Sequence, residues 1–264
     1  MLNISKLEYC KLEYQDNWLT LIINNKNKKN ALSKKLINEI ITILDSLKND
    51  NYIRGVILRG KNNIFCSGAD LEELHQIAYN KENKEELTIE MSKNIGKLLK
   101  SIRETPQITI SIIDGPCIAG GFGIACATDI IVTIKDSIFK LSETRLGLTP
   151  IQIAPYIFNR LNYSKARLMM LMGDTIDGEK AYNLGIADYL VKSKDNIEDI
   201  INKLKIQVNQ CSPNAISITK REFSTNFSID IEKAAEIFFE CIEHSEGKEG
   251  LQSFFEKDKP SWTT

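Results

Sequence analysis

The strongest constraint on the fold is an alternation of short apolar runs with helical segments. Residues 53–58, 108–113 and 130–134 form runs of four to six mostly β-branched or aliphatic residues, as expected of buried strands. Segments with helical periodicity or glycine-rich turns separate these runs. Strands that alternate with helices pair in parallel through crossover connections. The sequence therefore predicts an α/β architecture built on a parallel sheet.

The segments before the first run predict a hairpin and a helix. Residues 7–14 and 18–23 alternate or are β-branched, and the polar residues 15–17 between them favour a turn. Ser33 is the expected N-cap of a helix whose apolar residues recur at helical spacing as far as Leu47. The chain therefore enters the sheet through two strands before its first helix.

The last third of the chain is predominantly helical in pattern. Pro150 is expected to open a series of helices, interrupted by one short strand at 186–191. We expect residues 1–195 to form the core that carries the site. Residues 196–264 are expected to form a helical cap or assembly region.

Composition excludes several classes of protein. The 264 residues carry 34 basic and 35 acidic side chains, so no overall field attracts nucleic acid. The least polar stretch, 116–127, is too short to cross a bilayer, and the first ten residues contain Lys6 and Glu8 rather than a secretory signal. The six cysteines form no CxxC pair, and the two histidines have no metal-type spacing. We expect a soluble, cytoplasmic protein with free thiols, without a metal site and without a nucleic-acid or membrane partner.

Two strand-to-helix turns are candidate ligand sites. Residues 65–70 follow one buried strand, and residues 114–121 follow the next. Their small residues allow a ligand to approach the backbone, and ligands of open α/β sheets bind at the carboxyl ends of strands. One peptide N–H from each turn could converge on one oxygen and stabilise negative charge developing on a carbonyl. The alternative is that the glycines only permit tight packing.

Glu143 is a candidate acid/base. It lies in a modestly polar stretch, 139–150, between a strand and a helix. Partial desolvation would raise the pKa of this carboxyl and let it exchange a proton near neutral pH. The alternative is a surface ion pair with the neighbouring Arg145.

Five motifs together resemble the enoyl-CoA hydratase/isomerase (crotonase) family. They are INNKNKKNALS, FCSGADL, IDGPCIAGGFGIACATDI, FKLSETRLGLTP and EGLQSFFEKDKPSW, and they span about Leu7 to Trp262 in the family's order. The resemblance implies a spiral of ββα units with a helical C-terminal trimerisation region, in trimers often paired into hexamers. It also implies an enzyme of fatty acid metabolism that acts on acyl-CoA thioesters. No further cofactor is implied, because coenzyme A is part of the substrate.

The resemblance also assigns roles to individual residues. The backbone amides of Ala69 and Gly120 would form an oxyanion hole for the thioester enolate, and Glu143 would be the catalytic acid/base. Residues that would bind the substrate are Cys66, Ser67, Gly68 and Gly121 around the turns, Lys28 and Lys29 near the CoA phosphates, and Phe254 and Lys257 from a neighbouring subunit.

One family feature is missing. Gly123 stands where typical hydratases carry a first glutamate, whereas Glu143 matches the second. Hydration of a 2-enoyl-CoA, possibly of a branched, glutaconyl-type ester whose carboxylate would meet Gln152 or His75, is the favoured function. The alternatives are a Δ3/Δ2-enoyl-CoA isomerase, a decarboxylase of a β-carboxyl acyl thioester, and a scaffold that binds acyl-CoA without turnover. A dienoyl-CoA isomerase is disfavoured because Ile151 replaces that branch's extra carboxylate.

Overall fold

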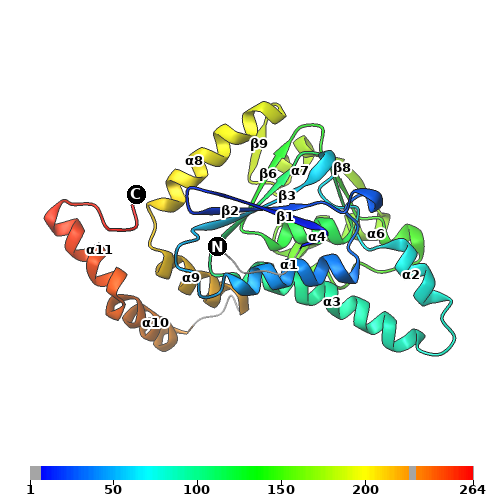
Figure 1. Cartoon of the computed structure of the whole chain (residues 1–264), viewed down its shortest axis with the longest axis horizontal. Helices are drawn as coiled ribbons and strands as arrows, with labels where there is room; N and C mark the ends of the chain where they lie inside the picture. The colour runs from blue at the N-terminus through cyan, green and yellow to red at the C-terminus, as the bar shows by residue number, and fades with distance from the viewer. Residues whose placement is uncertain (1–6, 226–229, 264) are drawn as a thin grey trace.

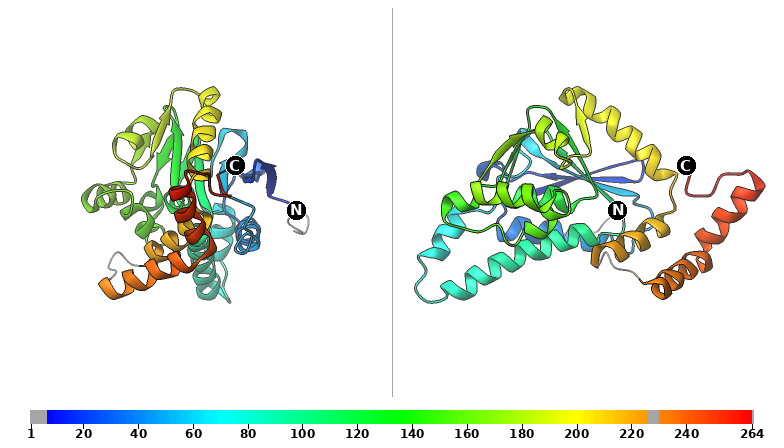
Figure 2. Two further views of the ribbon diagram at one scale, coloured as in Figure 1. Left: turned by 90° about the vertical axis from the view of Figure 1, so that its left-hand side faces the viewer. Right: turned by 180° about the vertical axis from the view of Figure 1, so that it is seen from behind.

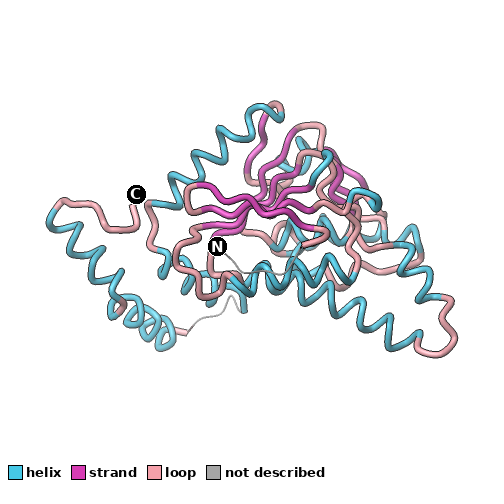
Figure 3. The backbone as a smooth tube through the Cα atoms, in the orientation of Figure 1, coloured by secondary structure: helices cyan, strands magenta, loops and turns pink. Residues whose placement is uncertain are grey.

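A six-stranded sheet forms the centre of the molecule (Figure 1, Figure 3). The computed structural model describes residues 7–225 and 230–263. The strand order is β1-β2-β3-β4-β6-β9, and every neighbouring pair is parallel except β1 with β2. The strands are β1 (Cys10–Gln15), β2 (Trp18–Ile23), β3 (Gly55–Gly60), β4 (Ile108–Ile113), β6 (Ile130–Ile134) and β9 (Tyr189–Val191). The predicted α/β architecture with a parallel sheet is confirmed.

The predicted hairpin and first helix are both present. Strands β1 and β2 are joined through Asp16 and Asn17, which have φ of 51° and 61°, the left-handed geometry that two-residue hairpin turns require. Helix α1 (Lys34–Ser46) begins after Ser33, whose side chain accepts a hydrogen bond from the Leu36 amide at 3.3 Å.

Some predicted boundaries were wrong. The strand expected at 53–58 is β3, which starts at Gly55, because the Asp50 carboxylate accepts bonds from the Tyr52 and Ile53 amides and holds the chain in a turn there. The short strand expected at 186–191 covers only Tyr189–Val191.

The helix expected to open at Pro150 also starts later. The carbonyl of Pro150 accepts bonds from the Ile153 and Ala154 amides, so residues 151–153 form a turn. Helix α5 therefore begins at Ala154, with Pro155 in its first turn, where proline's missing N–H is tolerated.

Helices cover both faces of the sheet. Figure 1 shows α1 and α3 (Lys84–Glu104) on one side of the sheet and α8 (Ile197–Asn209) on the other. Apolar side chains of α1, α3 and α4 (Gly120–Ala127) share one core cluster with the strands. The second cluster packs the buried residues of α8 against the opposite sheet face. Because α8 covers the sheet, it is packed as part of the core layer.

A second, three-stranded sheet lies next to the candidate site, and the sequence did not predict it. Its order is β5-β7-β8, formed by β5 (Pro116–Ile118), β7 (Ile138–Lys140) and β8 (Thr175–Asp177). Strands of three residues are too short for a periodic pattern. The remaining short helices of the core are α2 (Leu71–Ala78), α5 (Ala154–Phe158), α6 (Tyr163–Met172) and α7 (Gly178–Asn183).

The last two helices project from the body. Helix α9 (Pro213–Thr225) packs beneath the core, whereas α10 (Ile231–Glu243) and α11 (Ser245–Glu256) extend away from it (Figure 1, Figure 2). We call residues 230–263 the C-terminal arm. Among the described residues, no helix combines the length and the apolar character needed to cross a membrane.

Candidate active site

The first predicted turn holds the Ala69 amide in a fixed direction. Leu32 and Ala69 form a parallel β-bridge, and Leu32 takes part in both of its hydrogen bonds. The Leu32 amide donates to the Gly68 carbonyl at 2.8 Å, and the Leu32 carbonyl accepts from the Asp70 amide at 3.4 Å. In such a bridge the partner residue's own N–H points to the other side. The Ala69 amide therefore faces away from Leu32.

The second predicted turn presents the Gly120 amide. Gly120 is the first residue of α4, so its N–H has no acceptor within the helix. The preceding Ala119 has φ 51° and ψ -117°, a conformation that costs free energy in a residue with a Cβ, and its amide donates to the Lys140 carbonyl at 2.8 Å. The bond to β7 thus helps to hold the strained bend that orients the Gly120 N–H.

The two turns lie against each other. A Cβ placed on Gly120 would be 3.9 Å from the Ala69 nitrogen, and one placed on Gly68 would be 3.6 Å from the Gly120 nitrogen. Within residues 7–225 and 230–263, neither amide donates a hydrogen bond. The structure therefore brings together two unused N–H groups, one from each turn, at the positive end of a buried helix.

Asp70 and Lys28 brace the first turn. The Asp70 carboxylate is 2% exposed; it caps α2 by accepting bonds from the Glu72 and Glu73 amides, and it also accepts one from Lys28 Nζ at 2.6 Å. Lys28 Nζ also lies 3.0 Å from Glu72, and these partners raise the pKa of the ammonium. Lys28 is thus tied to α2, whereas the neighbouring Lys29 is exposed.

Glu143 is a partly desolvated carboxyl. It begins the short 3-10 helix Glu143–Leu146, three residues after Lys140, whose carbonyl anchors Ala119. Its Oε2 is buried and accepts no hydrogen bond from any described residue. Burial raises the pKa of this carboxyl, and the backbone amides of Glu143 and Ser142 only partly offset that effect. Arg145 donates to the Met172 carbonyl at 3.4 Å instead of pairing with Glu143.

The position of the missing glutamate is closed by apolar side chains. A Cβ on Gly123 would lie 2.6 Å from Ile153 Cγ2, 2.9 Å from Ile153 Cβ and 3.5 Å from Leu99 Cδ1. Ile153 is 4% exposed and Leu99 is fully buried. No side chain larger than hydrogen fits at Gly123 without a shift of Ile153.

Cys66 and Gly121 pack beneath the turns. The Cys66 amide donates to the Pro116 carbonyl at 3.2 Å, and its carbonyl accepts from the Ile118 amide at 2.9 Å. A Cβ on Gly121 would lie 2.6 Å from the Cys66 carbonyl oxygen, so only glycine permits this close approach. Burial raises the pKa of the Cys66 thiol to about 12, which keeps it neutral. Ser67 lies beside Lys28, its hydroxyl 3.4 Å from the Lys28 carbonyl.

Other predicted residues lie outside this group. Gln152 is exposed; it accepts a bond from the Ser92 hydroxyl of α3 at 3.1 Å. His75 is exposed on α2, where its ring lies 4.7 Å from that of Tyr79. Phe254 lies in the last turn of α11 and Lys257 directly follows this helix, which lies on the opposite side of the molecule from α2 (Figure 1).

The site depends on residues that the sequence analysis missed. Leu32 and Lys140 act through backbone carbonyls and amides, which leave no side-chain signal in a sequence. Ile153 acts by its shape alone. Asp70 could have been found, because an aspartate directly before a helix is a typical N-cap. Among the described residues, no group of three His, Cys, Asp or Glu side chains is placed to hold a metal ion.

Comparison with known proteins shows the family of the chain. The family model for enoyl-CoA hydratase/isomerase matches residues 13–264. An enoyl-CoA hydratase/isomerase structure from Marinobacter aquaeolei has a TM-score of 0.91 at 31% identity, covering 98% of this chain and 100% of that one. Pseudomonas aeruginosa AtuE has a TM-score of 0.91 at 30% identity, covering 97% and 100%.

A curated relative is the mitochondrial methylglutaconyl-CoA hydratase of Mus musculus, 28% identical over 270 residues, which cover 97% of this chain and 83% of that protein. A probable enoyl-CoA hydratase of Bacillus subtilis is 26% identical over 254 residues, covering 94% and 96%. The family match spans nearly the whole chain, residues 13–264. The chain therefore belongs to the enoyl-CoA hydratase/isomerase family of enzymes and has the crotonase fold.

Proposed function

We propose that this protein hydrates a 2-enoyl-CoA through a thioester enolate. The observation that carries the proposal is the pair of unused amides of Ala69 and Gly120 on adjoining turns. Two such donors would bind the thioester oxygen more strongly as it becomes an enolate oxygen. Loss of one oxyanion donor costs about 10² to 10³ in rate, so a pair supplies a large share of the acceleration.

Glu143 is proposed to carry the proton. In hydration, water adds to C3 while a proton reaches C2, and a single carboxylate can accept the proton of the water and deliver it to the enolate carbon. A desolvated carboxyl with a raised pKa exchanges protons more readily near neutral pH than an exposed one. Similarity to a methylglutaconyl-CoA hydratase supports a branched, glutaconyl-type ester. Gln152 remains the proposed partner for the carboxylate of that substrate.

A second candidate is isomerisation of a 3-enoyl-CoA to a 2-enoyl-CoA. The observation that favours it is the apolar wall of Ile153 and Leu99 at Gly123, which leaves Glu143 as the single proposed acid/base. In this reaction one carboxylate takes the proton from C2 and returns it to C4, and no water has to be activated. The oxyanion donors would act in the same way in both reactions.

The assembly is also a proposal. We propose that the protein forms a homotrimer or a hexamer, needs no cofactor besides the CoA of its substrate, and receives Phe254 and Lys257 at its site from a second copy. Supporting this, the arm that carries both residues lies away from the site of its own chain, and Phe254 is 77% exposed.

The test is product identification by mass spectrometry with crotonyl-CoA, a 3-enoyl-CoA and methylglutaconyl-CoA. Hydration adds the mass of water, isomerisation leaves the mass unchanged, and decarboxylation removes carbon dioxide. Conversion of at least one ester with gain of water is expected. Binding of every ester without conversion would contradict the proposal and favour a binding scaffold.

Replacement of the proposed catalytic carboxyl follows. Glu143→Gln should lower kcat by about 10² to 10⁴ while the affinity for the CoA ester changes little, because the proton transfer is lost and the shape is kept. Glu198→Gln is the matched control, since Glu198 is a 69% exposed side chain on α8. Equal turnover by Glu143→Gln and wild type would refute the role of Glu143.

A further inference from the structure

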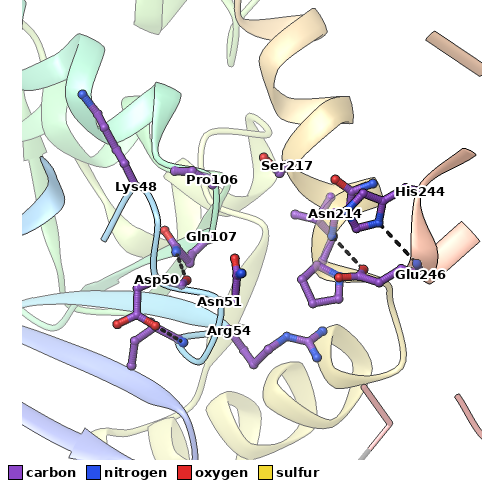
Figure 4. A pocket seen from close by; sticks show the side chains of 13 residues that line it. Lys48, Asp50, Asn51, Arg54, Pro106, Gln107, Asn214, Ser217, His244 and Glu246 are labelled. Carbon is purple, nitrogen blue, oxygen red and sulfur yellow. Dashed lines mark hydrogen bonds between the residues drawn. The ribbon is translucent and has the colours of Figure 1, made fainter. Parts of the chain in front are cut away.

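The C-terminal arm has few apolar contacts with its own core. Its helices α10 and α11 expose large apolar side chains, with Phe238, Phe239 and Phe255 each between 65% and 79% exposed. Burial of apolar area is therefore a weak determinant of where the arm lies in one chain. Its position therefore depends on polar attachments. One is the ion pair between Arg221 of α9 and Glu240 of α10 at 2.8 Å, and several others lie around one cavity between the core and the arm (Figure 4).

The central attachment is the side chain of Arg54. Arg54 directly precedes β3, and its own amide donates to the Asn17 carbonyl at 2.8 Å, so its backbone is fixed at the end of the sheet where β3 begins. The side chain is 8% exposed. One guanidinium nitrogen donates to the Trp262 carbonyl at 3.0 Å; the other donates to the carbonyls of Val208 and Cys211 at 2.9 and 2.6 Å.

This guanidinium joins three separate segments. Val208 lies in the last turn of α8, Cys211 lies in the turn before α9, and Trp262 lies in the tail after α11. A cation at the C-terminal carbonyls of a helix is favourable because it faces the negative end of the helix dipole. The planar guanidinium presents several N–H groups in fixed directions, so it can donate to carbonyls of different segments at once. A lysine ammonium, a compact charge on a flexible chain, cannot reproduce this arrangement.

Two further contacts hold the C-terminal arm next to the segments that Arg54 connects. The Glu246 carboxylate of α11 accepts bonds from the Ser212 hydroxyl at 2.6 Å and from the Asn214 amide at 3.0 Å, so it caps the start of α9. The Trp262 indole donates to the Gln210 carbonyl at 3.4 Å. Figure 4 shows Arg54 on the core side of the cavity, with Asn214, His244 and Glu246 on the opposite side.

The Trp262 ring connects the tail to α11 itself. A Cβ on Gly250 of α11 would lie 3.1 Å from the ring, so helix and indole are in direct contact. Arg54, by fixing the Trp262 carbonyl, thus sets the position of the ring on which α11 rests. Because α11 and the residue after it carry Phe254 and Lys257, the orientation of Arg54 is transmitted to both.

We propose that Arg54 is a positioning residue that orients the C-terminal arm so that it can complete the acyl-CoA site of a second copy. This inference rests on the proposed function, in which Phe254 and Lys257 bind the CoA ester in trans. It assigns to Arg54 no contact with substrate. Its loss should weaken binding of the CoA ester while the chemical step, built on the core turns, proceeds at nearly the same rate.

The test compares Arg54→Lys with wild type and with Lys48→Gln. Arg54→Lys keeps the charge and loses the planar guanidinium. Lys48→Gln removes a charge from the wall of the same cavity but leaves the contacts of Arg54 intact, since among the described residues Lys48 forms its ion pair with Asp45 of α1, at 2.7 Å. Amide hydrogen exchange should become about tenfold faster in residues 245–256 of Arg54→Lys and remain unchanged in β4. Lys48→Gln should exchange like wild type.

Steady-state kinetics separate positioning from mere stability. Arg54→Lys should raise KM and the dissociation constant for the CoA ester about five- to twentyfold, with kcat within about twofold of wild type. Loss of folded protein would instead lower kcat and leave KM unchanged. Trp262→Phe keeps Arg54 and its carbonyl partners but removes the indole N–H. It is expected to change amide exchange and KM in the same direction as Arg54→Lys by a smaller factor. This variant replaces Arg54→Lys in the test if Arg54→Lys does not fold.

Unchanged exchange of 245–256 in both variants would overturn the proposal. Faster exchange with an unchanged KM would also overturn it, because the contacts of Arg54 with the C-terminal arm would then have no effect on the acyl-CoA site. A wild-type protein that neither binds nor converts any CoA ester would refute the proposed function, and with it the effect on a second copy. The exchange comparison would still decide whether Arg54 holds the arm.

Discussion

Gly123 offers the sharpest test of how the site is built, because one added carbon meets a defined obstacle. The Cβ of Gly123→Ala would lie 2.6 Å from Ile153 Cγ2, whereas ordinary contacts begin near 3.4 Å. Ile153 would have to move by about 0.8 Å in a packed core, and overpacking of this kind costs about 1–3 kcal/mol. Removing a helix glycine returns about 1 kcal/mol. We therefore expect Gly123→Ala to lower the free energy of unfolding by about 1 kcal/mol.

Gly123→Glu should cost more, because it also places a carboxyl against Ile153 and Leu99. A buried polar group without a partner adds about 1–3 kcal/mol, so the total, after the gain from removing a helix glycine, is about 1–5 kcal/mol. Ile153→Ala alone should cost about 2–5 kcal/mol, as for other buried large-to-small changes. The double variant Gly123→Glu/Ile153→Ala should lose about 1–3 kcal/mol less stability than the two single losses added together, because the truncated Ile153 side chain makes room for the new glutamate.

Urea denaturation gives the four free energies of this cycle, and crotonyl-CoA hydration is measured on the same samples. If hydration is limited because Glu143 acts without a second carboxylate at position 123, the double variant should hydrate crotonyl-CoA faster than Ile153→Ala alone. Gly123→Ala as stable as wild type, together with strict additivity in the cycle, would refute the close packing of Ile153 on Gly123. Equal hydration rates would refute the inference that a second carboxylate is what the site lacks.

Two further predictions concern ionisable groups. Because burial raises the pKa of Glu143, the acid limb of kcat/KM should lie at higher pH than for an ordinary glutamate; a limb near the ordinary glutamate pKa of 4.5 would contradict this. The same group favours the folded state only while protonated. Its contribution to stability is present below the unfolded pKa and lost as pH rises through the folded pKa. The stability of Glu143→Gln relative to wild type, measured by urea denaturation, should therefore increase as pH rises above the ordinary glutamate pKa of 4.5. Lys220→Met should cost about 2–4 kcal/mol in thermal or urea unfolding, because Lys220, 10% exposed, pairs with Asp129 and donates to the Gln107 carbonyl at 2.6 Å. Adding Asp129→Asn should recover part of that loss, and no loss in Lys220→Met would show that the pair contributes nothing to stability.

Local pattern was sufficient for most of the fold. The strands at 108–113 and 130–134 have the predicted bounds, because a short buried strand is encoded in consecutive residues. The family motifs also predicted the crotonase fold. The three-residue strands β5, β7 and β8 could not be predicted, since each is stabilised by pairing with a partner distant in sequence rather than by its own residues.

The candidate site divides in the same way. The sequence by itself determined which residues were chemically able to act: two glycine-bearing turns, one carboxyl at Glu143, and a glycine where a second carboxyl would stand. Only the tertiary structure decided that Leu32 turns the Ala69 amide outward, that Ile153 fills the space at Gly123, and that burial leaves Glu143 Oε2 unpartnered. These facts depend on contacts between segments tens of residues apart. A residue's type and its neighbours along the chain specify hydrogen-bonding capacity and local conformation, whereas direction, solvent exclusion and available volume arise only when distant segments pack together.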